Sequence, residues 1–338
     1  MQRVYIIVLN WNGWQDTIEC LESVFRSDYP DFQVVVCDNG SKDASVERIK
    51  EWAEGRYQVE IAPENPLRYL VFPPVPKPIE FQEYDRAKAE AGGEAGDTEP
   101  RLVIIRIDEN LGFAGGNNVG IRYALAKGDC GYVWLLNNDT VVTPNALSGM
   151  VRRMVESPVA GMCGAKILYY DEPEKVQVLG GVSYNRWFGT TKQIGWLKSA
   201  DVPYDLLEVE RNMSYVTGAC MLVSRQFLET VGLMSEDYFF YFEELDWVMR
   251  ARGAFDLLYA PDSVVYHKEG RAVGGSSRAA NCKSYISDYY YLLNKIKITR
   301  KFFPYALPTV YLGILGTLAN RIRRRQWDRV GMVFKIWR

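Results

Sequence analysis

The chain alternates continuous apolar runs with segments in which apolar residues recur every three or four positions. The first two runs, 3–9 and 32–37, are rich in Val and Ile, as is typical of strands buried on both faces of a parallel sheet. The segments that follow them, 16–26 and 45–53, have the apolar spacing of helices. This alternation predicts an α/β fold with a doubly wound, mostly parallel sheet and helices on both of its faces.

The same alternation resumes later in the chain and predicts strands over 102–107 and 132–136 and a helix over 118–126. Between the two halves, residues 63–100 hold seven prolines and many polar residues, so we expect an insertion loop there. We therefore expect one large domain over 1–270 and a C-terminal helical region over 271–338.

Polar residues stand at the end of each predicted strand in the first 140 residues. They are Asn10 and Asn12, Asp38, Asn110, and Asn138 with Asp139. Ligand sites of open parallel sheets lie beyond the carboxyl ends of the strands, so these side chains predict a shared site for a nucleotide and a divalent cation. The alternative is that they only form turns and cap the following helices.

Two residues are candidate metal ligands. Asp139 follows a buried strand and precedes Thr140, and carboxylate oxygens suit Mg²⁺ or Mn²⁺. His267 is the single histidine of the chain and follows the apolar run 263–266. A lone histidine is commonly structural, but as a ligand it would favour Mn²⁺ over Mg²⁺.

At these residues the sequence resembles the family 2 glycosyltransferases of the GT-A fold, especially their rhamnosyltransferase-like branch. The resemblance covers residues 1 to about 270 and rests on VLNWNG (8–13), CDNGSKD (37–43), ENLGFAGGNN (109–118), LLNNDT (135–140), GACMLV (218–223) and YFEELD (241–246).

The resemblance implies roles for individual residues. It makes Asp38 a contact to the donor's base and Asp139 the metal ligand of the DxD-type motif, whose first acid is an amide in this chain. It places His267 near the metal and the diphosphate. The donor site would also include Asn10, Asn12, Asn110, Gly112, Asn117 and Asn138.

Three acids, Glu243, Glu244 and Asp246, stand at the start of a predicted helix that runs to Arg252. The corresponding family pattern is Glu-Asp-x-Asp, whose second acid is the catalytic base. That acid is Glu244 here, and Glu243 is the alternative. Acids in a first helical turn also stabilise the helix dipole, and Asp246 can pair with Arg250 four residues later.

The resemblance implies inverting transfer from a dTDP- or UDP-activated sugar, first of all dTDP-L-rhamnose, to a lipid-linked or polysaccharide acceptor in cell-surface polysaccharide biosynthesis. A Rossmann-type oxidoreductase is one alternative, which is weakened because residues 111–120 contain GxxGG and not GxGxxG. A non-catalytic sugar-nucleotide-binding protein is the other.

Charge is distributed unevenly along the chain. Residues 295–338 contain eleven Lys or Arg and one acid, and residues 302–319 are uncharged but interrupted by Pro304 and Pro308. This pattern favours a helix lying in the interface of an anionic membrane, or a re-entrant segment, over a spanning helix or a nucleic-acid partner. The alternative is a helix packed on the main domain or in a homo-oligomer.

The cysteines and the first residues suggest a compartment. The six cysteines are scattered without a CxxC pair, and no basic leader or small-residue cleavage site precedes the first apolar run. Both features favour a reducing environment. We therefore expect a peripheral protein at the cytoplasmic face of the cell membrane.

Overall fold

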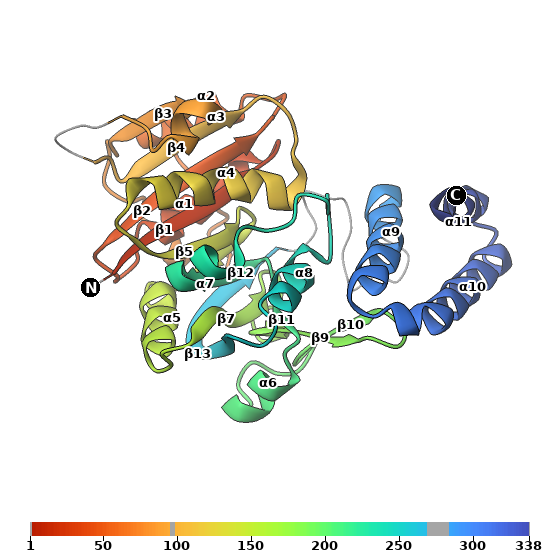
Figure 1. The fold of residues 1–338 in the computed structure, drawn as a ribbon. Helices are drawn as coiled ribbons and strands as arrows, with labels where there is room; N and C mark the ends of the chain where they lie inside the picture. The colour runs from red at the N-terminus through yellow and green to blue at the C-terminus, as the bar shows by residue number, and fades with distance from the viewer. Residues whose placement is uncertain (1, 95–98, 269–283, 338) are drawn as a thin grey trace.

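The computed structural model of the chain describes residues 2–94, 99–268 and 284–337. Within them, ten strands form one large sheet in the order β3-β4-β2-β1-β5-β12-β7-β13-β6, with β8 paired to β7 (Figure 1). Its strands are β1 (Arg3–Asn10), β2 (Phe32–Asn39), β3 (Phe81–Asp85), β4 (Leu102–Ile107), β5 (Cys130–Asn137), β6 (Thr140–Val142), β7 (Ala160–Tyr169), β8 (Val176–Leu179), β12 (Cys220–Ser224) and β13 (Asp256–His267). The first five in this order are mutually parallel.

Helices cover both faces of this sheet because its strands are apolar on both sides. In β1, Val4, Ile6 and Val8 belong to the core under α1 (Trp14–Val24), α2 (Ser45–Ala53) and α5 (Ala146–Val155). Tyr5 and Ile7 point to the opposite core, under α3 (Arg86–Glu90), α4 (Gly112–Lys127) and α7 (Arg225–Val231). The predicted fold class is confirmed.

Glycines let α4 lie unusually close to the sheet. A Cβ atom at Gly116 would stand 2.5 Å from Leu9 Cδ1, and one at Gly120 would stand 2.8 Å from Ile7 Cγ2. Both distances are shorter than any normal contact between carbon atoms. The glycine-rich segment therefore serves helix packing, and it fixes the N-terminus of α4 at the edge where β1 and β2 end.

Residues 63–100 were expected to form an insertion loop, and this prediction is wrong for the part that forms regular secondary structure. It contains a short 3₁₀ helix, η1 (Arg68–Leu70), then β3 and α3. β3 pairs with β4, which would otherwise be the edge strand, and the hydrogen bonds of this pairing are not revealed by composition. Leu67, Leu70 and Val71 are buried. Residues 95–98 of the predicted loop lie outside the described part.

A smaller sheet stands beside the large one. It consists of β9 (Gly181–Asn185), β10 (Thr190–Gln193) and β11 (Tyr215–Val216). The segments around it are α6 (Leu206–Asn212) and α8 (Glu243–Arg250). β9 and β10 form an antiparallel hairpin, and Figure 1 shows this hairpin reaching toward the C-terminal helices.

The C-terminal helices are α9 (Tyr285–Phe302), η2 (Pro304–Ala306), α10 (Leu307–Arg323) and α11 (Trp327–Trp337). Figure 1 shows them together at one side of the large sheet. They share a small core that includes Ile296, Ile314 and Met332. The uncharged stretch 302–319 is divided between the end of α9, η2 and α10. Of the helices described, none is long and apolar enough to span a bilayer.

Candidate functional site

The ends of β1, β2 and β5 are joined by a continuous chain of hydrogen bonds. Asn10 Nδ2 donates to Asp38 Oδ1 at 2.7 Å, and Thr17 Oγ1 donates to Asn10 Oδ1 at 2.8 Å. Asn138 Nδ2 in turn donates to Thr17 Oγ1 at 3.0 Å. All four side chains are buried. The structure therefore brings together the predicted residues at these three strand ends.

The loops after β1 and β2 hold each other through Ser41. The backbone N–H of Asn12 donates to Ser41 Oγ at 2.9 Å, and the backbone N–H of Ser41 donates to Asp38 Oδ2 at 3.3 Å. Asn12 Oδ1 accepts from the Lys42 backbone at 2.7 Å. Asp38 is thus oriented by its neighbours on both loops, whereas Asn12 is exposed at the rim.

Asn39 joins the end of β2 to the loop that precedes α4. Its Nδ2 donates to Asn110 Oδ1 at 3.0 Å, and its Oδ1 accepts from the Leu111 backbone at 3.0 Å. Gly112 has a φ of +73°, and a Cβ atom there would stand 2.5 Å from Phe239 O, so only glycine fits. Asn117 is buried in α4 and donates to Phe113 O at 2.9 Å, a contact within the helix.

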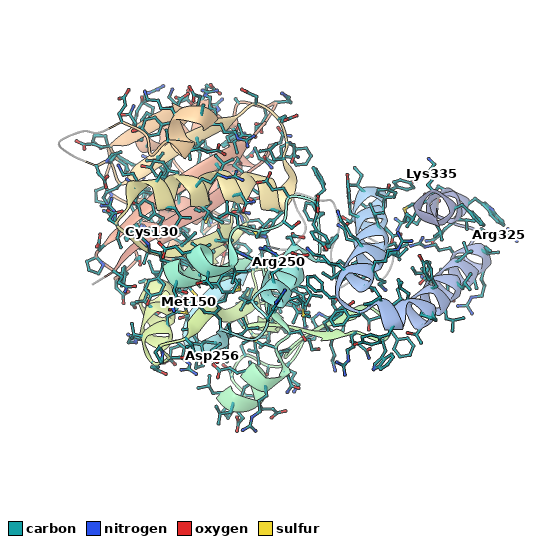
Figure 2. All side chains as sticks on the ribbon, in the orientation of Figure 1. Cys130, Met150, Arg250, Asp256, Arg325 and Lys335 are labelled. Atoms are coloured by element: carbon teal, nitrogen blue, oxygen red, sulfur yellow. The ribbon has the colours of Figure 1, made fainter. Side chains whose placement is uncertain are left out.

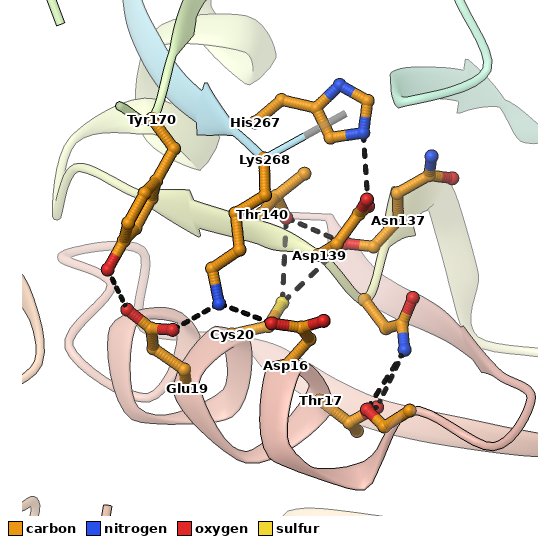
Figure 3. Close-up of polar contacts among 12 residues, drawn as sticks. Asp16, Thr17, Glu19, Cys20, Asn137, Asp139, Thr140, Tyr170, His267 and Lys268 are labelled. Carbon is orange, nitrogen blue, oxygen red and sulfur yellow. Dashed lines mark hydrogen bonds and ion pairs between the residues drawn. The ribbon is translucent and has the colours of Figure 1, made fainter. Parts of the chain in front are cut away.

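Asp139 and His267, the two predicted metal ligands, face each other (Figure 3). The distance from His267 Nε2 to Asp139 Oδ1 is 3.0 Å, because β13 pairs with β6 and places His267 opposite Thr140. The other ring nitrogen, Nδ1, lies 2.9 Å from Gln177 Oε1 in β8. Burial alone would raise the pKa of Asp139, but the His267 ring and Lys268 outweigh it and lower that pKa.

This pair fits a divalent cation. A neutral His267 that donates its Nδ1–H to Gln177 has its Nε2 lone pair on the side of Asp139. Neighbouring ligands of an octahedral ion, each about 2.1 Å from it, lie about 3.0 Å apart, as these two atoms do. Within the described residues no group of three or more His, Cys, Asp or Glu side chains could hold a metal ion. Asp139 and His267 are thus the side chains that the described part of the chain offers to the ion.

Lys268 binds the end of β13 to α1 (Figure 3). Its ammonium group pairs with Asp16 at 2.5 Å and with Glu19, and its side chain is only 4% exposed. Tyr170 donates to the other oxygen of Glu19 at 2.5 Å. The backbone N–H of Lys268 donates to Asp139 O at 3.0 Å. Lys268 therefore contacts Asp139 directly and fixes the residue that follows His267.

Glu244 is connected to the end of β5 through the segment Gly218-Ala219. Its Oε1 accepts from the Gly218 backbone at 3.1 Å, and the Asn137 backbone at the end of β5 donates to Ala219 O at 3.0 Å. A Cβ atom at Gly218 would lie 2.7 Å from Glu244 Oε1 and 2.9 Å from Phe113 Cζ. The Gly218-Ala219 segment thus links Glu244 to β5 and to the start of α4.

Glu243 and Glu244 differ in their surroundings. Glu243 is 3% exposed, and its Oε2 has no hydrogen-bond partner among the described residues. Burial, with the negative charge of Glu244, raises the pKa of Glu243 well above its usual range. Glu244 is half-buried, and burial raises its pKa too. The pair therefore holds one proton more readily than two separate carboxylates would.

Asp246 was expected to accompany these two acids, but the structure gives it an anchoring position. It is fully buried, and its carboxylate pairs with Arg250 at 2.9 Å and with Lys301 of α9 at 2.5 Å. Tyr238 also donates to it at 3.1 Å. Three donors thus surround the carboxylate, and its described contacts join α8 to the C-terminal helices.

Sequence reasoning missed Thr17, Gln177 and Lys268. Lys268 follows His267 directly, so its position in the chain was a usable signal. Thr17 lies on the first turn of α1, next to a strand end already singled out. Gln177 lies in a region where the apolar pattern is irregular, and no feature of the sequence near it points to His267.

The chain is similar in sequence to known glycosyltransferases. The family described as Glycosyl transferase family 2 matches residues 5–65 and 84–232. The low-salt glycan biosynthesis hexosyltransferase Agl10 of Haloferax volcanii is 27% identical over 146 residues, which are 42% of this chain and 44% of that protein. The chain spans less than half the length of the curated relatives it matches.

Two solved structures share the fold. The mannosyltransferase PcManGT of Pyrobaculum calidifontis, in complex with GDP-Man and Mn²⁺, is 14% identical with a TM-score of 0.52, covering 99% of this chain and 85% of that one. GalNAc-T7, with UDP, GalNAc and Mn²⁺, is 12% identical with a TM-score of 0.55, and the match covers 87% of this chain and 47% of that one. The two structures show the fold, and the family match favours sugar transfer over the oxidoreductase alternative.

Proposed function

The chain belongs to glycosyl transferase family 2, and from that premise we propose that it is an inverting enzyme. It would move a hexose from a nucleotide-diphospho-sugar to an acceptor hydroxyl, with the help of a divalent metal. The observation that carries this proposal is the Asp139–His267 pair at 3.0 Å, placed at the edge where β1, β2 and β5 end. This edge is where open α/β sheets bind nucleotides.

Asp38 is the proposed contact to the donor's base. Asn10 and the Ser41 backbone fix both oxygens of its carboxylate, so it is oriented before a nucleotide arrives. A preformed acceptor of this kind binds the N–H group of a base without a cost of reorganisation. Asn110 and Gly112 shape the adjoining loop, and Asn138 connects this part of the site to Asp139.

Asp139 and His267 would hold Mg²⁺ or Mn²⁺, and the imidazole favours Mn²⁺. An ion held there would supply Lewis-acid stabilisation of the charge on the departing diphosphate. Gln177 keeps the His267 ring in place through Nδ1. Lys268 holds the end of β13 on α1. The chain's own contribution is thus to hold two ligands at a fixed separation.

Glu244 is the proposed general base. It takes the proton of the acceptor hydroxyl while that oxygen attacks the anomeric carbon from the side opposite the diphosphate, so the configuration inverts. Its raised pKa brings it closer to working pH, where a general base is most effective. Glu243 remains the alternative base, although it is more deeply buried.

The preferred substrates are dTDP-L-rhamnose and a lipid-linked or polysaccharide acceptor, in the biosynthesis of a cell-surface polysaccharide. Support for glycan assembly comes from the Haloferax volcanii relative, a hexosyltransferase of glycan biosynthesis. We place the protein at the cytoplasmic face of the cell membrane.

A donor screen tests this function. Release of nucleoside diphosphate is measured across dTDP-, UDP- and GDP-sugars with Mn²⁺, for the unchanged protein and for Asp139→Ala and His267→Ala. Asp201→Ala, in an exposed loop, is the control. We expect release from one class of donor, lost in both site variants and kept in the control. Donor binding without release by the unchanged protein would instead support the non-catalytic alternative.

A further inference from the structure

The outer face of α10 is apolar although it faces solvent. Leu312, Leu315 and Ile322 are 65%, 44% and 45% exposed, and their spacing places them on one side of the helix. The inner side is apolar as well, because Val310 and Ile314 are buried in the helical core. Surface helices normally turn a polar face outward, so this second apolar face needs a partner.

The hairpin between β9 and β10 extends this face. Its tip carries Arg186, Trp187 and Phe188, all exposed, with Trp187 and Phe188 at 48% and 52%. The Trp187 ring meets that of Tyr305 edge-on at 5.3 Å, and Thr309 donates a hydrogen bond to Trp187 O. Exposed aromatic residues from two distant parts of the sequence therefore lie side by side at the start of α10.

Positive charge marks the other end of the face. Arg323, Arg324 and Arg325 are exposed where α10 ends, and Trp327 beyond them is 63% exposed. Figure 2 shows Arg325 at the outer end of the helical region, far from the large sheet. The sequence contains no acid from residue 302 to residue 327. Aromatic and aliphatic side chains next to arginines are typical of helices that lie in a bilayer interface.

We propose that the hairpin tip and the outer face of α10 dock on an anionic lipid bilayer. The face is apolar enough to enter the headgroup region, and its cationic end complements acidic lipids. A contact of this face with the same face of a second copy fits less well, because Arg186 and Arg323 to Arg325 would bring positive charge from both copies together. The docking surface is defined as residues 186–188, Tyr305, the outer residues of α10, and Arg323 to Arg325.

Docking would also define the route of the acceptor, a consequence that rests on the proposed function. A cavity of about 580 Å³ lies beside the hairpin, lined among others by Tyr184, Trp187 and Phe303. Leu245 and Met249 of α8 form another part of its wall, and α8 begins with the two candidate bases. A lipid-linked acceptor could therefore approach α8 from the membrane without leaving the bilayer.

Flotation with vesicles tests the docking surface. The full chain is mixed with vesicles of phosphatidylcholine alone or with about a third phosphatidylglycerol and is then centrifuged on a density gradient. We expect it to float only with the anionic vesicles and to be released by high salt. Arg323→Gln, Arg324→Gln and Arg325→Gln together should lower the partition coefficient about 10²-fold, since each basic residue contributes about five-fold.

A second pair of variants separates the apolar face from general effects. Leu312→Ser with Leu315→Ser should lower the partition coefficient about ten-fold or more. Val155→Ser with Leu207→Ser is the matched control, since these two side chains are 68% and 56% exposed elsewhere on the molecule. Circular dichroism verifies that all variants fold. An equal loss in the control pair, or full-length protein that never floats, overturns the proposal.

Two further readouts keep the alternatives apart. Light scattering without lipid reports the oligomeric state, and a dimer that Leu312→Ser with Leu315→Ser converts to a monomer would assign the face to a second copy and overturn docking. Nucleoside diphosphate release in solution should be unchanged in these variants. If no protein releases it, the proposed enzyme activity fails, while flotation still decides docking.

Discussion

Replacing Lys268 with Met tests whether the ion cluster on α1 supports the metal site. The substitution keeps most of the side-chain volume but removes the cation between Asp16 and Glu19. Their side chains are 14% and 10% exposed, and that of Lys268 is 4% exposed. Breaking such a buried pair costs about 3 to 5 kcal/mol. We expect the free energy of unfolding to fall by about 3 kcal/mol, the low end of this range, because Tyr170 still donates a hydrogen bond to Glu19.

The same substitution should weaken metal binding. Lys268 follows His267, and the changed side chain no longer holds this end of β13 on α1. Loss of a residue that orients a metal ligand typically costs about 10- to 100-fold in metal affinity. Urea unfolding measures the stability, and titration of Mn²⁺ by electron paramagnetic resonance, with a nucleoside diphosphate present, measures the affinity.

Two controls separate stability from positioning. Lys77 forms another buried ion pair, at 3.0 Å, with Glu22 of α1. Lys77→Met breaks this pair and should lower stability without changing Mn²⁺ affinity. Lys268→Met combined with Asp16→Asn and Glu19→Gln leaves no unpaired charge, so stability should largely return while affinity stays low. If Lys77→Met weakens Mn²⁺ binding as much as Lys268→Met does, the positioning argument is refuted.

Further predictions concern the residues of the site itself. Asp139→Ala should abolish transfer, as should a chelator added to the unchanged enzyme, and full activity in excess chelator would contradict the metal-dependent mechanism. Glu244→Gln should lower turnover by about 10² to 10⁴ and Glu243→Gln by less, with the reverse order moving the base to Glu243. Because burial raises the pKa of Glu244, kcat/KM should fall as pH is lowered through a value above the usual glutamate range, and a limb at that usual range would count against this base. Asp38→Ala should weaken nucleoside diphosphate binding more than turnover, which calorimetry can show, and unchanged affinity would argue against its contact to the base.

Much of the fold follows from local patterns in the sequence. The strands β1, β2, β4 and β5 are buried on both faces and therefore form continuous apolar runs. Strands and helices alternate along this part of the chain, as they do in a doubly wound sheet. β3 could not be predicted, because its residues 81–85 are mostly half-exposed and become a strand only by pairing with β4. Long-range pairing of this kind overrides local composition.

The candidate site residues could be predicted from the sequence where they lie at or directly after the end of a strand. Asp38 lies near the end of β2, His267 is the last residue of β13, and Asp139 follows β5. The structure brings Asp139 and His267 within 3.0 Å of each other. Gln177 was not predictable, because its place beside His267 depends on β8 pairing with β7, two elements without a distinctive pattern. Asp246 shares a motif with Glu244, but the side chains of a helix diverge within two residues, and its carboxylate faces Lys301 instead.

The most direct test of the metal site is pulsed electron paramagnetic resonance of the protein with Mn²⁺ and a nucleoside diphosphate. Nitrogen bound directly to Mn²⁺ modulates the spin echo, and His267 is the single histidine of the chain. We predict that the unchanged protein gives an imidazole nitrogen signal and that Asp201→Ala retains it. His267→Ala should remove this signal, and Asp139→Ala should lose it together with the bound ion. Tight Mn²⁺ binding without an imidazole signal, unchanged in both site variants, would contradict the assignment of Asp139 and His267 as the metal site of this glycosyltransferase.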